Sequence, residues 1–250
     1  MIKINLSKLH DSQPPIRFSV SPLFEIAASL HVLTQALPTI QHHQWVKKSR
    51  EILKQEGLYA EWLYFSPLFY CAVPSMFAVH QTEALTTEEE QLAYLTDLPL
   101  AQFIDSCRET LNSSVGRGRL PHTSLLIDLL CEPELIRGRF NLFLAAYTHY
   151  IFREKWDELQ PAVARERARF ESLRSAKAVC QYLQQILPFP LTCDASQLVL
   201  RLPDSAVEPD SPEVVRLALH PSWFLPHPPQ YTQAGDTLHI AYSLLSQALR

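Results

Sequence analysis

Ten histidines give the chain groups that could bind a metal ion or transfer a proton near neutral pH. His42 and His43 are adjacent, so on a helix their side chains point about 100° apart and cannot easily share one ion. His149 has no acidic or histidine residue four positions away, which is the spacing of helical zinc sites. His220 and His227 are spaced like no standard site. We therefore predict no bound metal and no cofactor.

The sequence also lacks a motif for nucleophilic catalysis. The sequence has no Gly-x-Ser-x-Gly turn, which exposes the serine of many hydrolases. Cys71 lies among apolar residues, a setting that does not activate a thiol. Glu132 and Glu134 flank Pro133 at an expected helix start, where carboxylates stabilise the helix dipole. We predict no catalytic residue and no enzyme activity.

An aromatic stripe between residues 140 and 150 is the most suggestive feature. Phe140, Phe143, Tyr147 and Tyr150 follow each other at helical spacing. Such a stripe either packs as ordinary core or lines an apolar pocket in which the hydroxyls orient a ligand. The candidate ligand-binding residues are His31, Trp45, Trp62, Tyr64, Phe143, Tyr147 and Tyr150.

The composition excludes several functions. Five glycines among 250 residues are too few for a glycine-rich phosphate loop, which needs backbone without a Cβ close to the phosphate. Twenty-two basic against 26 acidic residues give a net charge of −4, with no basic cluster that could neutralise nucleic-acid phosphates. The five cysteines form no closely spaced pair, and the N-terminus does not resemble a signal peptide. We expect a cytoplasmic protein with reduced thiols that does not enter a membrane.

Periodicity predicts a mainly α fold. A multi-helix body follows two short N-terminal strands, 2–6 and 16–20, and precedes a small C-terminal β element of about three strands. Ser21 and Pro22 are typical of a helix start, and Thr86–Glu90 is typical of a capping box. A long helix is expected over 133–159, broken by Pro161.

These elements suggest three parts of the chain. Residues 1–190 are expected to form a mainly helical domain for sensing or dimerisation. Residues 191–242 are expected to form the small β element, because apolar residues alternate in three segments, 198–202, 215–219 and 238–240. Residues 243–250 resemble the start of a helix that would lead into a further domain.

Three segments resemble one family of bacterial regulators. Ser21–Glu25 and Ser29–Leu33, with the later Leu217–Phe224, are similar to the long N-terminal domain of ArsR-like winged-helix transcription regulators. In that family a β segment leads into a DNA-binding module, and 244–249 resembles its beginning. No recognition helix or wing is present in the 250 residues, so no DNA-binding residue can be assigned. The cysteine pairs of metal-sensing relatives are also missing.

The resemblance implies a regulatory portion of an ArsR-like regulator, without its DNA-binding module. Its expected partners are a small apolar ligand, a second copy of the chain, and DNA only through a winged helix outside these residues. Two alternatives remain open at this stage. One is a stand-alone helical enzyme acting on a small apolar substrate, and the other is a protein-interaction adaptor.

Overall fold

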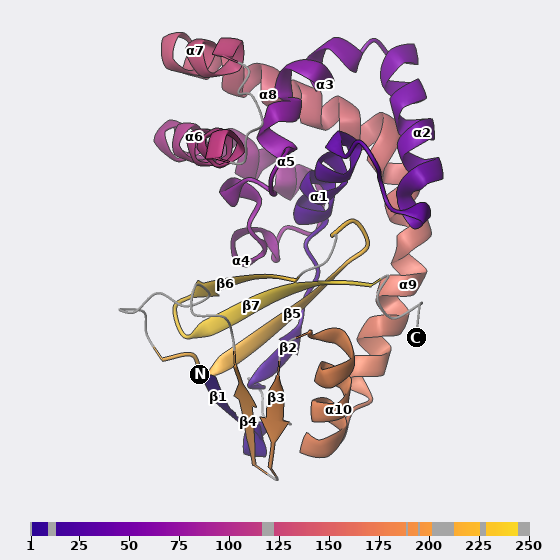
Figure 1. The fold of residues 1–250 in the computed structure, drawn as a ribbon, viewed down its shortest axis with the longest axis vertical. Coiled ribbons are helices and arrows are strands. Elements are labelled where there is room, and N and C mark those ends of the chain that lie inside the picture. The colour runs from indigo at the N-terminus through magenta and orange to yellow at the C-terminus, as the bar shows by residue number, and fades with distance from the viewer. Residues whose placement is uncertain are drawn as a thin grey trace. The chain divides into compact units, whose positions relative to one another are not determined.

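The computed structural model describes residues 2–9, 14–116, 123–188, 190–194, 196–201, 213–225 and 229–244. The chain forms two compact units (Figure 1). The helical unit is Ser21–Glu158, and the β unit combines Met1–Val20 with Leu159–Arg250. The division differs from the expected domains 1–190 and 191–242. The reason is that the N-terminal strands pair with strands from the end of the chain, which places them in the β unit.

The helical unit follows the expected helices closely. Its last element, α9, begins here and continues into the β unit. The elements are α1 (Pro22–Thr34), α2 (Ile40–Gln55), α3 (Tyr59–Phe65), η2 (Ser66–Phe69), η3 (Ser75–Phe77), α4 (Val79–Thr82), α5 (Glu88–Asp97), α6 (Leu100–Gly116), α7 (Thr123–Cys131), α8 (Pro133–Tyr147), η4 (Thr148–Phe152) and α9 (Arg153–Glu171).

Local sequence explains where several of these helices begin and end. The Phe24 N–H donates to Ser21 Oγ at 3.1 Å, which caps α1. The Thr87 hydroxyl accepts from the backbone of Glu90, whose carboxylate accepts from the Thr87 N–H, so the expected capping box is confirmed. Gly57 follows α2 with φ of 70°, a conformation that favours glycine.

The long helical segment after Pro133 differs from the prediction. It divides into α8, a π-helical turn at η4, and α9, which continues through Pro161 to Glu171. A proline removes one helical hydrogen bond, but a helix can continue through it when packing holds both sides. Leu159 and Val163, both buried, hold α9 in place on either side of the proline.

Aromatic rings fill the core of the helical unit. Phe140 of α8 is fully buried, and its ring lies 5.1 Å from Phe65 and 5.7 Å from Phe103, centroid to centroid. Phe69 and Phe77 pack against the same ring. The four rings around Phe140 come from α3, η2, η3 and α6, so this one side chain of α8 contacts four other elements of the unit.

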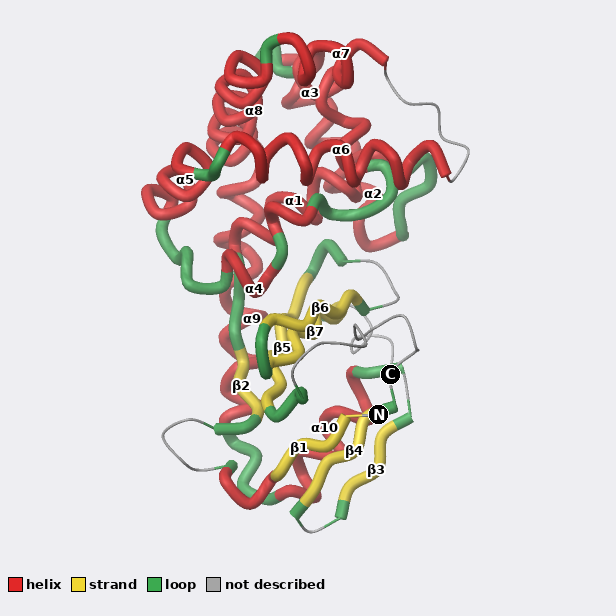
Figure 2. The backbone as a smooth tube through the Cα atoms, turned by 90° about the vertical axis from the view of Figure 1, so that its left-hand side faces the viewer, coloured by secondary structure: helices red, strands yellow, loops and turns green. Residues whose placement is uncertain are grey.

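The β unit contains two sheets (Figure 2). The strands are β1 (Ile2–Asn5), β2 (Ile16–Phe18), β3 (Leu191–Cys193), β4 (Gln197–Leu200), β5 (Arg216–Ser222), β6 (Gln230–Ala234) and β7 (Thr237–Ser243). The first sheet is antiparallel, in the order β1-β4-β3. In the second, ordered β2-β5-β7-β6, β2, β5 and β7 are parallel and β6 is antiparallel to β7.

The mainly helical class and the N-terminal strands are confirmed. The three strands expected near the C-terminus correspond to β4, β5 and β7, and β3 and β6 accompany them. Between the sheets and α10 (Ala176–Ile186) lies a core that includes Ile4, Leu183 and Leu217. Ser243, expected to begin a helix, ends β7, and residues 245–250 of that predicted helix lie outside the described residues.

Two of the cysteines correct the expectation of reduced thiols. Cys180 of α10 and Cys193 of β3 form a disulfide, with Cα atoms 6.2 Å apart. Sequence spacing did not indicate the pair, because it depends on the packing of α10 against β3. The other cysteines, Cys71, Cys107 and Cys131, are not part of a disulfide. Among the described residues, no helix has the length and apolar character needed to cross a membrane.

Candidate functional site

The aromatic stripe of α8 belongs mostly to the core. Phe143 is buried and stacks on Phe65, with ring centroids 5.8 Å apart. Tyr147 is fully buried, and its hydroxyl lies 2.7 Å from Ser29 Oγ. Burial raises the pKa of Tyr147 well above its ordinary value, so the phenol stays protonated at neutral pH. These side chains therefore pack and hydrogen-bond within the protein.

Tyr150 does not lie on the same helix face as the rest of the stripe, because the number of residues per turn changes before it. A straight α-helix would place Tyr150 on the face of Tyr147, but the π-helical turn Thr148–Phe152 inserts extra backbone into the repeat. Ile151 and Phe152 are buried instead, and Tyr150 is 46% exposed. The turn also aims Thr148 and Phe152 toward the groove described below.

Three further candidates from the sequence, His31, Trp45 and Trp62, are buried in the helical unit. His31 is buried on α1, and its Nδ1 donates to the Phe69 carbonyl at 2.6 Å. Trp45 and Trp62 are buried on α2 and α3. Their surroundings, like that of His31, are the interior of the helical unit.

Tyr64 of α3 is half-buried and belongs to a polar contact with α7 and α8. Its hydroxyl donates to Asp128 Oδ2 at 2.6 Å, and the Arg139 guanidinium lies over its ring at 4.5 Å. Burial, followed by the bond to Asp128, raises the pKa of Tyr64. The contact joins helices and does not line the groove.

A groove in the helical unit runs along α1, α5, α8 and the start of α9. It consists of two pockets of about 510 and 650 Å³ that share four lining residues and are open to solvent. The shared residues are Ile26, Glu88, Gln91 and Thr148. We refer to these two adjoining pockets as the groove.

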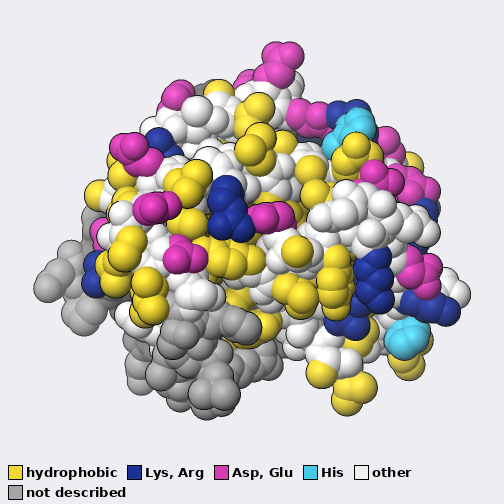
Figure 3. Space-filling model, turned by 90° about the horizontal axis from the view of Figure 1, so that it is seen from above, with side chains coloured by type: hydrophobic (Ala, Val, Ile, Leu, Met, Phe, Trp, Pro, Cys, Tyr) yellow, Lys and Arg dark blue, Asp and Glu magenta, His cyan; other side chains and the backbone are white. Residues whose placement is uncertain are grey.

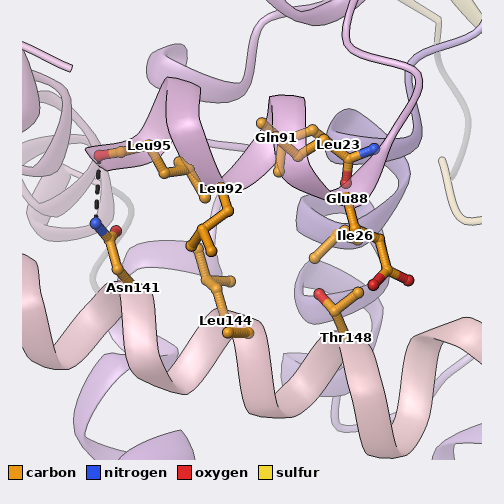
Figure 4. A pocket seen from close by; sticks show the side chains of 10 residues that line it. Leu23, Ile26, Glu88, Gln91, Leu92, Leu95, Asn141, Leu144 and Thr148 are labelled. Atoms are coloured by element: carbon orange, nitrogen blue, oxygen red, sulfur yellow. Dashed lines mark hydrogen bonds between the residues drawn. The ribbon is translucent and has the colours of Figure 1, made fainter. Parts of the chain in front are cut away.

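The first pocket has an apolar floor with polar groups at its side (Figure 4). Leu92 and Leu95 of α5 face Leu144 of α8, and Leu23 and Ile26 of α1 close one end. Asn141 Nδ2 donates to the Leu95 carbonyl at 3.3 Å and ties α8 to α5. Gln91 Nε2 donates similarly to the Leu85 carbonyl. The pocket can hold an apolar body and offers amide groups beside it.

The second pocket is more polar and carries charge. Thr86, Glu88, Arg153 and Asp157 line it together with the rings of Phe152 and Trp156. Glu88 accepts from Arg153 through both carboxylate oxygens, with the Nε contact at 2.8 Å. The ion pair raises the pKa of Arg153 further above its ordinary value, so the guanidinium stays charged.

The β unit buries a different set of polar side chains. Tyr182 donates to Glu166 Oε1 at 2.5 Å, and Tyr242 donates to the same oxygen at 3.2 Å. Burial raises the pKa of both phenols, so they remain donors at neutral pH. On neighbouring strands, His220 Nε2 lies 3.1 Å from His239 Nδ1. The Glu166 cluster is satisfied internally and joins α9, α10 and β7.

Sequence reasoning missed the groove residues. None of the seven candidate residues lines either pocket of the groove. Neither Ile26 nor Glu88, which both pockets share, is among those candidates. A usable indication was Leu92 and Leu95, which are apolar residues on a helix that is otherwise acidic and polar. The π-helical turn had no signature in the sequence.

The fold and the groove define a mainly helical protein. Its helical unit contains the groove, and the two ends of the chain form a small unit with two sheets. Residues 1–128 match the model of a family of unknown function, DUF5937. The match covers just over half of the chain, and the protein belongs to this family. It includes α1 and α5 of the groove, whereas α8 and α9 lie beyond it. No curated protein and no solved structure is significantly similar to the chain.

Proposed function

We propose that this chain is the ligand-sensing portion of a cytoplasmic ArsR-like transcription regulator, and that the groove is its ligand site. The observation that carries the proposal is the groove itself, with leucines on its floor and hydrogen-bonding groups at its side. A regulator needs two states whose populations a ligand can shift by binding one of them better. A ligand that bridges α1, α5 and α8 would favour one arrangement of these helices.

The position of α1 supports this proposal. Two of the three segments that resemble the regulator family, Ser21–Glu25 and Ser29–Leu33, are part of α1 or its N-cap, and the third begins in β5. Leu23 and Ile26 of the same helix line the groove. The first of the resembling segments therefore lies at the candidate ligand site.

A dye-binding experiment tests the ligand site. We expect the uncharged apolar dye Nile red to gain fluorescence on binding the purified protein. Ala145 is exposed and lines the groove, so Ala145→Trp should fill the first pocket and abolish the gain. Leu142→Trp is the matched control, because Leu142 is exposed on the same helix outside the groove. Equal binding by both variants would contradict the proposed site.

The regulator assignment has its own test. The product of the complete reading frame should retard DNA from upstream of its own gene in a gel-shift experiment. A product that binds this DNA no better than an unrelated fragment would contradict the assignment. That result would leave the dye-binding test of the groove unaffected.

A protein-interaction adaptor is a second candidate, favoured by exposed apolar side chains on α7 and α8. Ile127, Leu130, Leu135 and Leu142 are each more than half exposed. Figure 3 shows hydrophobic side chains gathered in groups between charged ones on the upper face of the helical unit. Such a surface suits a protein partner, including a second copy of this chain. Light scattering of the wild type and of Leu142→Glu tests it: a mass that halves in the variant supports a dimer.

A further inference from the structure

The two pockets of the groove differ in chemistry, and this difference indicates what ligand would fit. Leucine side chains and Ile26 dominate the first pocket, which lies between α5 and α8 (Figure 4). The second pocket continues from it through the shared Glu88 and Thr148 and contains most of the charge. A ligand that follows the whole groove would need an apolar body with one polar end.

The charges of the second pocket favour a cation at that end. Two carboxylates, Glu88 and Asp157, line it together with one guanidinium, Arg153. Arg153 is already held by both oxygens of Glu88. Asp157 therefore adds a negative charge that this ion pair does not balance.

Aromatic rings lie on the same rim. The ring of Trp156 stacks on the buried ring of Phe152, with centroids 5.8 Å apart and planes 17° from parallel. Phe152 fixes the indole, which is half-buried and therefore partly open to solvent. An indole face beside a carboxylate is a common arrangement for binding an organic ammonium group.

We propose that the groove binds an amphiphilic organic cation. Its apolar body would lie over Ile26, Leu92 and Leu144, and its ammonium group would lie between Asp157 and Trp156. An anionic amphiphile would meet two carboxylates and a guanidinium whose charge already serves Glu88, so it would be repelled more than attracted. This inference rests on the proposed function, because it names the ligand class of the same groove.

Displacement of Nile red by three probes with the same eight-carbon chain tests the inference. These are octyltrimethylammonium, octanesulfonate and octanol, which carry a positive, a negative and no charge. We expect octyltrimethylammonium to compete about tenfold better than octanesulfonate, because the excess carboxylate attracts the cation and repels the anion; tenfold corresponds to about 1.4 kcal/mol. The preference should shrink as salt is added.

Two variants locate the cation. Asp157→Asn should weaken octyltrimethylammonium about fivefold, and Trp156→Leu should weaken it by a similar factor. Glu158→Gln is the matched control, since it removes the next carboxylate of α9, which binds Lys155 and does not line the groove. An equal effect of Asp157→Asn and Glu158→Gln would overturn the proposed contact.

The outcomes separate this inference from the proposed function. Nile red binding that Ala145→Trp abolishes, with no preference among the three probes, would overturn the cation alone. A preference for octanesulfonate would likewise overturn it and point to Arg153 as the recognition group. Failure of Nile red and of all three probes to bind would overturn the ligand site itself.

Discussion

The helical unit and the β unit bury polar groups in different ways. In the helical unit the interior is aromatic, and the deepest phenol, Tyr147, has one hydroxyl partner, Ser29. Both units bury a carboxylate, Glu25 of α1 and Glu166 of α9. In the β unit two phenols donate to Glu166, and a disulfide joins α10 to β3. Both described pockets of the groove lie in the helical unit. We therefore propose the ligand site in the helical unit, while the disulfide and the Glu166 cluster tie the elements of the β unit together.

Removing the central ring of the helical unit should have the largest effect. Phe140→Ala deletes a fully buried ring with four aromatic neighbours, so we expect a loss of about 3–5 kcal/mol in the free energy of unfolding. Urea unfolding followed by circular dichroism measures it. Leu142→Ala is the control on the same helix, because an exposed leucine should change stability by less than about 0.5 kcal/mol. Similar losses in the two variants would show that Phe140 is not the centre of this core.

Removing the carboxylate of the Glu166 cluster in the β unit should have the second-largest effect on stability. Glu166→Ala removes the acceptor of two buried phenols. Their hydroxyls lie 2.8 Å apart, so one can donate to the other and only one loses its acceptor, which should cost about 2 kcal/mol. Glu166→Gln keeps a carbonyl acceptor and should cost less. Urea unfolding of the wild type and the two variants measures the order of their free energies of unfolding. A Glu166→Ala variant as stable as the wild type would mean that the cluster does not hold α9, α10 and β7 together.

A single hydroxyl of the helical core should have a smaller effect. Tyr147→Phe removes the bond to Ser29 but leaves the ring, so we expect a loss of about 1 kcal/mol. Nile red affinity should not change, because Tyr147 does not line the groove. A loss of dye binding without a loss of stability would return Tyr147 to the candidate ligand residues.

The smallest effect is expected at the surface and depends on pH. The N–H groups of Thr86 and Thr87 donate to Glu90 Oε2 at 2.8 and 3.0 Å, and they lower the pKa of Glu90 below its ordinary 4.5. Because the folded pKa is depressed, the stabilisation is present above pH 4.5 and is lost as the pH falls through the folded value. Glu90→Gln should therefore lower the Tm near neutral pH and have less effect in acid.

Its control is the neighbouring Glu89→Gln, since Glu89 is exposed in the same helical turn and does not take part in the capping box. Thermal unfolding at several pH values compares the two variants. A Tm difference between wild type and Glu90→Gln that grows in acid would contradict the assigned direction.

Sequence reasoning was most successful where the cause of structure is local. Ser21 caps α1 and Thr87 pairs with Glu90 because each bond spans three residues, a distance visible in the sequence. Alternating residues in 198–202, 215–219 and 238–240 were similarly sufficient to predict β4, β5 and β7. Periodicity failed at Tyr150, since one π-helical turn changes which residues face inward.

The sequence by itself determined the mainly helical class, the caps and most strand positions, because these follow from contacts within a few residues. Tertiary structure decided the rest. It paired β1 with β4 across nearly the whole chain, joined Cys180 to Cys193, and brought Ile26, Leu92 and Leu144 to one groove. Each of these depends on packing between segments far apart in sequence, and no local spacing records which distant segments will meet.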